Sequence, residues 1–508
     1  MLVCRMFLLL ATFAAALEAV PAGAREAVLP QPQALPLMGH KGAVPLVAIP
    51  RRGNAVATAG TDGTIRIWDA TTGDQLHKLQ IARKAAGMAF APDGKTLVSL
   101  SSGKKTVLVL WDAVAGKPVQ RLSLGSRKIG GPGPILDFSP GGKAIAAGLG
   151  DVTSTISTVS LRTSFIRFRS VHGGVSAVSF APAGQHLAVG DESGTVYMLD
   201  GGTGRVQYQI RCSGKVTMLA FHRDGTKLMV ADGSRSLRIL EIGTRKEQAA
   251  FASKDAITAL ALSPDGKQLA TAGDAGTVLL WDISGKKQRQ FRAGGAVTAL
   301  AYSPDGKRLA TVGPEGAVLW NLTRDEKPLP RDFKLSPKEL ERHWDELAAG
   351  QGDRVYTAAR LLRADPARSV PFIQKHLAPK DAGPDPKKIK QLIADLDSDE
   401  FMKREAATKE LGNLGMAIES DLRDALSSPS SLEAASRLKH LLKRLEEHAQ
   451  TRTALQQRDV RAVHVLEQVG TPEAKKVLET LSTKASGWWV QREARDALER
   501  LGWGGLKR

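Results

Sequence analysis

The sequence predicts a mainly β fold followed by an α-helical one: a seven-bladed β-propeller and then a helical domain. Two observations predict the propeller, a motif that recurs seven times and a Trp-Asp ending that recurs in phase with it. A third predicts the helices, because leucine and alanine replace glycine and β-branched residues after residue 330. The predicted boundaries are 1–24 for a signal peptide, 33–325 for the propeller, 326–335 for a linker and 336–508 for the helical domain.

The chain begins with a segment typical of an export signal. Arg5 supplies a positive start, residues 7–17 form an apolar run, and Ala22-Gly23-Ala24 has the small residues of a cleavage site. The run is shorter than the roughly 20 apolar residues of a transmembrane helix, and the alternative is an uncleaved amphipathic or core helix. We therefore expect an exported protein, periplasmic or extracellular, with no transmembrane segment in the mature chain.

One motif recurs along the next 290 residues or so: an apolar or aromatic residue, a Ser/Ala-Pro-Asp-Gly-Lys turn and an apolar run. Proline presets φ, aspartate caps its own backbone and glycine accepts a positive φ, so each copy predicts a tight turn between two short strands. The copies begin at Ile49, Phe90, Phe138, Phe180, Phe221, Leu262 and Tyr302, at intervals of 41, 48, 42, 41, 41 and 40 residues.

A second motif ends each repeat 18 to 21 residues after it begins. Seven starts and seven ends in phase resemble the WD-repeat family, which implies a ring of four-stranded sheets that bury their faces against one another. The endings are Trp68-Asp69, Trp111-Asp112, Leu199-Asp200, Leu240-Glu241, Trp281-Asp282 and Trp320-Asn321, with a weak equivalent near Val159-Ser160.

The same resemblance implies how the ring closes. In this family the first strand of the chain completes the last blade, and the last repeat here stops near Trp320 with Pro328 and Pro330 soon after it. Residues 35–40, which end in Gly39-His40, are therefore expected to supply the missing outer strand.

Well-formed blades of this family also hold a hydrogen-bonded group of His, Ser/Thr, Asp and Trp. Blade one matches it fully with His40, Thr58, Asp62 and Trp68, whereas Ala275 takes the Asp position in blade six. We interpret this tetrad as structural, so that His40 is a satisfied scaffold residue and not a catalytic base.

The C-terminal third shows helical spacing. Ser336 and Pro337 fit an N-cap and the first helical position, and residues 399–415 and 460–502 resemble HEAT-type repeat helices, with a plain bundle as the alternative. Trp488 and Trp489 are either a binding patch or core residues. Together with the signal and the propeller, this tail looks like a family of large exported bacterial WD-repeat proteins. Further helices are expected over 354–363, 369–377, 386–396, 400–414, 418–426 and 431–447.

The sequence shows no motif for catalysis. It contains no GxxxxGK[ST] loop, no GxSxG elbow, no HExxH and no Cys/His cluster. Asp191-Glu192 is interpreted as a solvated turn, and Cys212, alone once the signal is removed, as a small buried hydrophobe. We therefore predict a protein that is not an enzyme and uses no cofactor or metal.

The charge balance suggests the partner. Of the net charge of +19, residues 25–327 carry +15, from 38 Lys and Arg against 23 Asp and Glu. A basic surface favours acidic partners. The first hypothesis is thus a scaffold that binds an acidic protein or polymer through loops on the narrow face of the propeller. The loop residues expected to do so are Arg83, Lys84, Lys104, Lys105, Arg127, Lys128, Lys215, Arg235 and Lys254.

The second hypothesis is a propeller enzyme or ligand-binding protein that acts on a cell-envelope substrate through a central channel. Nucleic acid is disfavoured as a partner, because export argues against it and the basic loops lack interleaved aromatic residues for stacking. The sequence leaves the oligomeric state open.

Overall fold

The computed structural model of the chain describes most of residues 31–502. The described residues are 31–81, 83–125, 129, 135–150, 152–157, 163–169, 173–233, 235–252, 255–326, 329–330, 332–349, 352–379, 385–414, 418–448 and 453–502. The expected signal peptide, 1–24, and the basic loop residues Arg127, Lys128 and Lys254 lie outside them.

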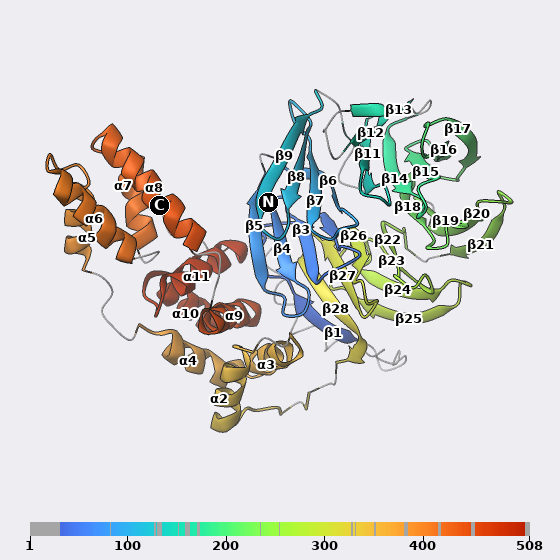
Figure 1. Cartoon of the computed structure of the whole chain (residues 1–508). Helices are drawn as coiled ribbons and strands as arrows, with labels where there is room; N and C mark the ends of the chain where they lie inside the picture. The colour runs from blue at the N-terminus through green and yellow to red at the C-terminus, as the bar shows by residue number, and fades with distance from the viewer. Residues whose placement is uncertain are drawn as a thin grey trace, which may run out of the picture.

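Seven antiparallel four-stranded sheets form the propeller, which confirms the predicted fold class (Figure 1). Within each of the first six sheets the strands pair in sequence order. Blade one comprises β2 (Leu46–Ala48), β3 (Ala55–Ala59), β4 (Thr64–Asp69) and β5 (Gln75–Gln80); blade two β6 (Ala85–Phe90), β7 (Thr96–Ser101), β8 (Val107–Asp112) and β9 (Lys117–Ser123); blade three β10 (Leu136–Phe138), β11 (Ala144–Leu149), β12 (Val152–Ser157) and β13 (Thr163–Arg169).

The remaining blades repeat the plan, and the seventh takes its outer strand from the start of the described chain. Blade four comprises β14 (Val175–Phe180), β15 (His186–Asp191), β16 (Thr195–Asp200) and β17 (Val206–Arg211); blade five β18 (Val216–Phe221), β19 (Lys227–Asp232), β20 (Ser236–Glu241) and β21 (Glu247–Ala252); blade six β22 (Ala259–Leu262), β23 (Gln268–Ala272), β24 (Thr277–Asp282) and β25 (Lys287–Arg292); blade seven β26 (Ala299–Tyr302), β27 (Arg308–Gly313), β28 (Gly316–Asp325) and β1 (Pro32–Pro36).

The repeated Pro-Asp-Gly motif forms the turn between the first two strands of a blade. In blade two, the Asp93 carboxylate accepts the backbone N–H groups of Lys95 and Thr96 at 2.8 and 2.9 Å. Gly94 adopts φ 70°, in the left-handed region that favours glycine. The turn chemistry in the sequence therefore accounts for the local geometry.

The hydrophobic core of the propeller lies between blades. One cluster combines Ile65 and Ile67 of blade one with Leu97 and Trp111 of blade two, all buried. Side-chain hydroxyls add polar bridges between neighbouring blades: Ser176 donates to the Val216 carbonyl at 2.6 Å, Thr258 to that of Val297 at 2.6 Å and Thr298 to that of Pro45 at 3.2 Å. Each blade is thus held by its neighbours, as a sheet that cannot bury both faces alone requires.

Ring closure uses the predicted partner strands but not the predicted bounds. β1 spans Pro32–Pro36 and pairs antiparallel with β28, with Leu35 opposite Leu319. The expected segment, 35–40, is therefore wrong by about three residues. After Leu37, whose N–H donates to the Ala317 carbonyl at 2.9 Å, the chain must turn toward blade one, so Met38–His40 cannot continue the strand.

Ten helices follow in the described residues, and their positions agree with the helical spacing of the sequence. Ser336 caps the first of them through a capping box with Glu339, and Pro337 occupies the first turn as predicted. They are α2 (Pro337–Glu346), α3 (Gly352–Ala364), α4 (Pro366–Leu377), α5 (Pro386–Asp395), α6 (Phe401–Leu414), α7 (Glu419–Ser427), α8 (Leu432–His448), α9 (Ala454–Val469), α10 (Pro472–Thr483) and α11 (Trp488–Arg500).

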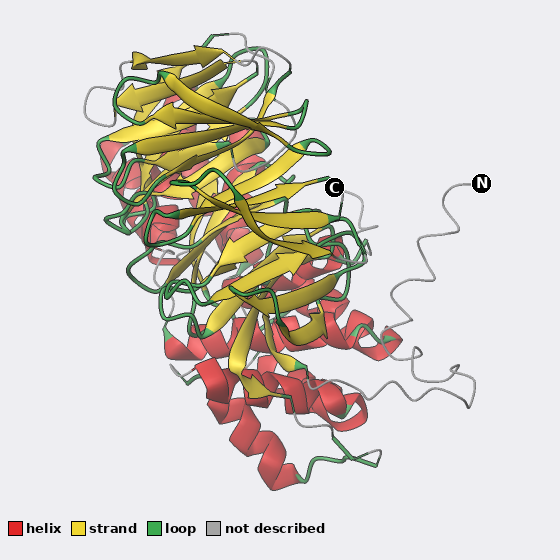
Figure 2. Ribbon diagram, turned by 90° about the vertical axis from the view of Figure 1, so that its right-hand side faces the viewer, coloured by secondary structure: helices red, strands yellow, loops and turns green. Residues whose placement is uncertain are grey.

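The helices share two cores. Helices α2, α3, α4, α9, α10 and α11 enclose the first, and α5 to α8, which we call the α5–α8 lobe, enclose the second. Trp489 packs against the first core and Trp488 against the second, so the two tryptophans join the cores instead of forming a free binding patch. In the view turned by 90°, the helices lie behind and below the strands (Figure 2).

Candidate interaction surface

The loops of the propeller form two opposite ends. Because each sheet is a meander, the connections between its second and third strands lie at the same end as the connections that lead from one blade to the next. We call this end the upper face. Six of the nine basic residues singled out from the sequence lie within the described residues; all six belong to connections of these two kinds and are exposed.

Blade two brings four of them together. Arg83 and Lys84 lie between β5 and β6, and Lys104 and Lys105 lie between β7 and β8. The two loops touch, because a Cβ placed on Gly103 would lie only 2.3 Å from Cδ of Arg83. We call these four residues the blade-two basic group.

Lys215 and Arg235, the other basic residues of this set within the described part of the chain, do not extend this group into a continuous patch. Lys215 forms an ion pair with Glu192 at 2.7 Å, and Arg235 lies in a separate tight turn at φ 68°. Asp274 and Glu315 are exposed in the upper loops of blades six and seven. Among the described residues, the upper loops therefore carry exposed cations at blade two and exposed carboxylates at blades six and seven.

The tetrad residues of blade one meet beneath the upper face. His40 Nε2 lies 2.8 Å from the Thr58 hydroxyl, and the Trp68 indole N–H donates to the same hydroxyl oxygen at 2.7 Å. His40 Nδ1 lies 3.2 Å from the Asp62 carboxylate. Asp62 in turn accepts the Lys41 N–H at 3.0 Å, so the tetrad also fixes the backbone that enters blade one.

Burial governs the protonation of this group. Desolvation lowers the pKa of His40, and only part of that effect is offset by its hydrogen bond to Asp62. Burial alone would raise the pKa of Asp62, but hydrogen bonds from His40 and from the Lys41 N–H hold that pKa far below its usual value. A neutral His40 imidazole that is hydrogen-bonded to the Asp62 carboxylate therefore has a structural role, because it links the residues of blade one. A Trp–hydroxyl pair recurs in three other blades, as Trp111 with Ser99, Trp281 with Thr271 and Trp320 with Thr311.

We expect Thr58→Val to destabilise the protein by about 2–3 kcal/mol, because it leaves the Trp68 N–H and one His40 ring nitrogen buried without their shared partner. Thr311→Val is the matched control, since within the described residues the Thr311 hydroxyl hydrogen-bonds only to the Trp320 indole. We expect this variant to lose about 1 kcal/mol of stability. Urea unfolding of both variants measures the difference. Equal costs would contradict a cooperative role for the tetrad.

The helical region covers the flank of blade one. Arg461 on α9 is buried and donates to the Asp74 carboxylate from Nε and Nη2, at 2.9 and 2.5 Å. Its Nη1 donates to the Leu347 carbonyl and, at 3.0 Å, to that of Ala349. At the upper end, Lys41 forms ion pairs with two acidic residues of α11, Asp496 and Glu499. Sequence reasoning missed this interface, because its partners lie hundreds of residues apart.

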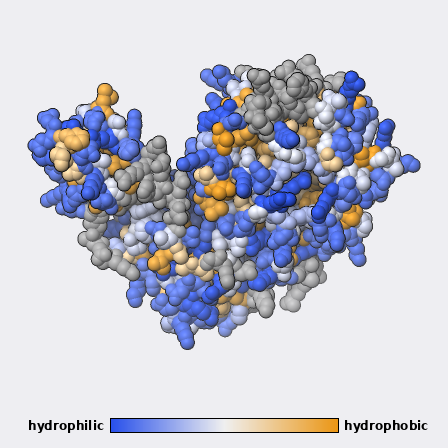
Figure 3. Space-filling model, in the orientation of Figure 1, coloured by the Kyte–Doolittle hydropathy of each residue, from blue (hydrophilic) through white to orange (hydrophobic). Residues whose placement is uncertain are grey.

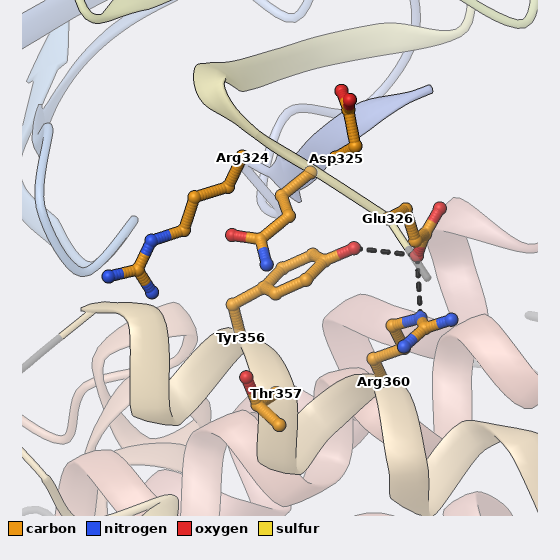
Figure 4. Close-up of a pocket in the computed structure, with 7 residues that line it drawn as sticks. Arg324, Asp325, Glu326, Tyr356, Thr357 and Arg360 are labelled. Carbon is orange, nitrogen blue, oxygen red and sulfur yellow. Dashed lines mark hydrogen bonds and ion pairs between the residues drawn. The ribbon is translucent and has the colours of Figure 1, made fainter. Parts of the chain in front are cut away.

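A cavity of about 430 Å³ lies where β1 and β28 meet α3 (Figure 4). On its wall Glu326 accepts hydrogen bonds from the Tyr356 hydroxyl and from Nε of Arg360, both at 2.7 Å. These bonds join the end of the propeller to the first helices. The cavity is accordingly part of the contact between the two regions.

The described residues contain little that suggests catalysis. No group of three or more His, Cys, Asp or Glu residues there could hold a metal. Burial raises the pKa of Asp137 to about 6, although the Phe180 N–H, 2.8 Å away, opposes the shift. This is a single carboxylate with no neighbouring histidine among its interactions, so the enzyme hypothesis gains no support from it.

The structure also shows the surroundings of Asp191 and Cys212, for which the sequence predicted a solvated turn and a buried thiol. The interpretation of Asp191-Glu192 as a solvated turn is wrong for Asp191, which is fully buried. It ends β15 and its carboxylate accepts the N–H groups of Ser193 and Thr195, so it shapes the turn from inside. Cys212 is half-buried, and burial raises the pKa of its thiol to about 11, which disfavours a reactive thiolate.

None of the described helices is both long and apolar enough to cross a membrane. The profile of the WD domain, G-beta repeat family matches residues 32–69, 163–200, 246–282 and 285–320. Each of these four segments covers the outer strand of one blade and the three inner strands of the next: β1 to β4, β13 to β16, β21 to β24, and β25 into β28.

Curated relatives match parts of the chain. They include Telomerase protein component 1 of Rattus norvegicus, 28% identical over 153 residues, which covers 30% of this chain and 6% of the relative. Eukaryotic translation initiation factor 3 subunit I of Phaeosphaeria nodorum is 31% identical over 77 residues, or 15% and 23% of the two chains.

Guanine nucleotide-binding protein subunit beta of Oryza sativa subsp. japonica is 27% identical over 166 residues, which covers 30% of this chain and 43% of the relative. The chain thus spans less than half of the length of each of these relatives. The repeat matches and the seven four-stranded blades lead to one conclusion: the chain carries WD40 repeats in a seven-bladed β-propeller, and a C-terminal helical region follows it.

Proposed function

We propose that this protein is a non-enzymatic interaction scaffold that holds an acidic protein or polymer on the blade-two basic group. The observation that carries the proposal is the juxtaposition of Arg83, Lys84, Lys104 and Lys105 on two touching loops. The two loops, residues 81–84 and 102–106, contain no acidic residue. Four exposed cations on one short stretch of surface attract and orient an acidic partner.

The relatives support an interaction role. Two of them are named as subunits, of a translation initiation factor and of a guanine nucleotide-binding protein. Blade one of this chain is already covered on its flank by the helical region, and blade two is its neighbour in the ring.

The proposal includes export through residues 1–24 and the boundaries 33–325 and 336–508 for the two domains.

The proposal also includes a HEAT-type arrangement for the α5–α8 lobe. Helices α5 and α6 pack as one hairpin, and α7 and α8 as the next. The hairpins then stack with α5 against α7 and α6 against α8. This order is what repeated helix pairs of a solenoid show.

A double charge reversal tests the basic group. We expect Lys104→Glu/Lys105→Glu to reduce capture of an acidic partner about tenfold in a pull-down from the envelope fraction of the source cell, because two attractive charges become repulsive. Lys286→Glu/Lys287→Glu is the matched control, since it makes the same change in net charge on an exposed pair at the opposite end of the ring.

The control separates a local effect from a general one. Equal loss in both variants would mean that only the net charge matters, and unchanged capture by the first variant would remove the basic group from the interface. Thermal unfolding of both variants checks that the propeller is intact.

A further inference from the structure

The α5–α8 lobe ends in a tip that is formed by two turns lying side by side. One turn joins α5 to α6 and the other joins α7 to α8, and the Ser431 hydroxyl of the second donates to the Asp397 carboxylate of the first. Farther along, Arg437 of α8 donates to Glu405 and Thr408 of α6 at 2.7 and 3.2 Å. Helices α6 and α8 therefore run parallel, and both begin at the tip.

Large apolar side chains are exposed at these two helix starts. Phe401 is 59% exposed, Met402 76% and Leu432 93%. Eight large hydrophobic residues among those described are at least 42% exposed, and three of them lie here. In Figure 3 the lobe is the knob at the left, where orange surface lies among blue and a notch separates the lobe from the propeller. A grouped apolar surface of this kind is typical of an interaction site.

The rim of this apolar group is acidic, although the whole chain is basic. Residues 395–405 and 427–433, together with Arg437, which pairs with Glu405 and Glu433, contain six acidic and three basic side chains, a local balance of −3 in a chain of net charge +19. Another of the three basic residues, Arg404, donates to the Ser398 and Asp399 carbonyls. The acidic residues are Asp395, Asp397, Asp399, Glu400, Glu405 and Glu433.

The blade-two basic group has the complementary chemistry. It offers four cations and no acidic residue, and the long stems of lysine and arginine can cover apolar surface while their charged ends meet carboxylates. A guanidinium can also stack on an aromatic ring, and Arg404 of the same helix already lies over that of Phe401, with its Cζ 5.8 Å from the ring centroid. Because both surfaces belong to the same chain, the tip of one copy can meet the basic group of another without a third molecule.

We propose that the tip of the α5–α8 lobe binds the blade-two basic group of a second copy of this chain. This inference deepens the proposed function and rests on it, because it names an acidic partner for the same basic group. The two surfaces differ, so a pair of copies joined by one contact still has one unoccupied tip and one unoccupied basic group. Further copies can therefore add until a ring closes. The assembly weakens as salt increases, because exposed charges are screened.

Sedimentation velocity of the full chain over a range of concentration and salt measures this association. We expect wild type to associate, and both Lys104→Glu/Lys105→Glu and Asp399→Lys/Glu400→Lys to raise the dissociation constant about tenfold. We also expect an equimolar mixture of the two variants to associate, because each supplies the charge that the other lacks. Phe401→Ala/Met402→Ala should weaken association without a change in charge, and Lys286→Glu/Lys287→Glu should leave it unaltered.

Several results would overturn the inference. A wild-type chain that stays monomeric at every concentration, or variants whose mixture does not associate, would exclude the contact. The proposed function would still stand if the wild type captured an acidic partner and Lys104→Glu/Lys105→Glu lost it. Conversely, restored association in the mixture together with no capture of any other partner would support self-association and reject the broader scaffold role.

Discussion

A chain that begins at residue 41 should lose at least ~5 kcal/mol of stability, a large share of the ~5–15 kcal/mol that holds a typical domain. This truncation removes β1, whose five residues pair with β28, and with it about five backbone hydrogen bonds worth ~1 kcal/mol each. It also removes buried Leu37 and the tetrad residue His40. Blade seven would then expose an unpaired edge along Leu319 and Trp320.

Thermal unfolding followed by circular dichroism measures this loss. The matched control begins at Gln31, which keeps β1 and removes only residues that precede it. We expect the control to unfold with the cooperativity of the full chain and the longer truncation to unfold broadly at a lower temperature. Equal midpoints would show that β1 does not close the ring.

Arg461→Ala should cost about 3 kcal/mol, because it leaves the Asp74 carboxylate and the Leu347 and Ala349 carbonyls at the interface without their common donor. The helical region should then loosen from blade one. Urea unfolding gives the loss of stability, and limited proteolysis of residues 326–335 reports the loosening of the connection.

Lys475→Ala is the control for a surface charge. Lys475 lies 3.9 Å from Glu479 one helical turn away, and such exposed pairs contribute about 0.3–0.5 kcal/mol. If Arg461→Ala costs no more than this control, the Arg461–Asp74 pair does not hold the two regions together.

The truncation to residue 41 and Arg461→Ala should both affect the interaction surface. The tetrad and Lys41 lie at the entry to blade one, and Lys41 reaches α11 of the helical region. A fixed helical region keeps the α5–α8 lobe at a constant position relative to blade two. Loss of the Arg461 contact should therefore impair binding that uses both surfaces more than binding to the blade-two basic group alone.

Much of the fold could be predicted because it is encoded locally. The Pro-Asp-Gly turns, the Trp-Asp endings and the Ser336 cap each depend on a few neighbouring residues, and their spacing determines the number of blades and the start of the helices. The tetrad was also predictable, because a known pattern places His40, Thr58, Asp62 and Trp68 at fixed intervals. Such local preferences favour the same turn or cap whatever the tertiary structure around them.

The distribution of charge could be predicted only in part. The sequence identified basic loops, but not that Lys215 pairs with Glu192 or that two touching loops at blade two bring four of the described cations together. Loop conformation decides which charges are neutralised, and the sequence pattern does not determine that conformation. Asp191 shows the same limit, since its burial follows from the path of the turn around it.

By itself, then, the sequence determined a ring of seven blades with one full tetrad, followed by helices. The tertiary structure decided that residues 32–36 form the closing strand, that Arg461 joins the helices to blade one, and that Phe401, Met402 and Leu432 meet at one tip. The physical reason is sequence separation. Turns and caps form between near neighbours, whereas these contacts join segments up to hundreds of residues apart and exist only once both have folded.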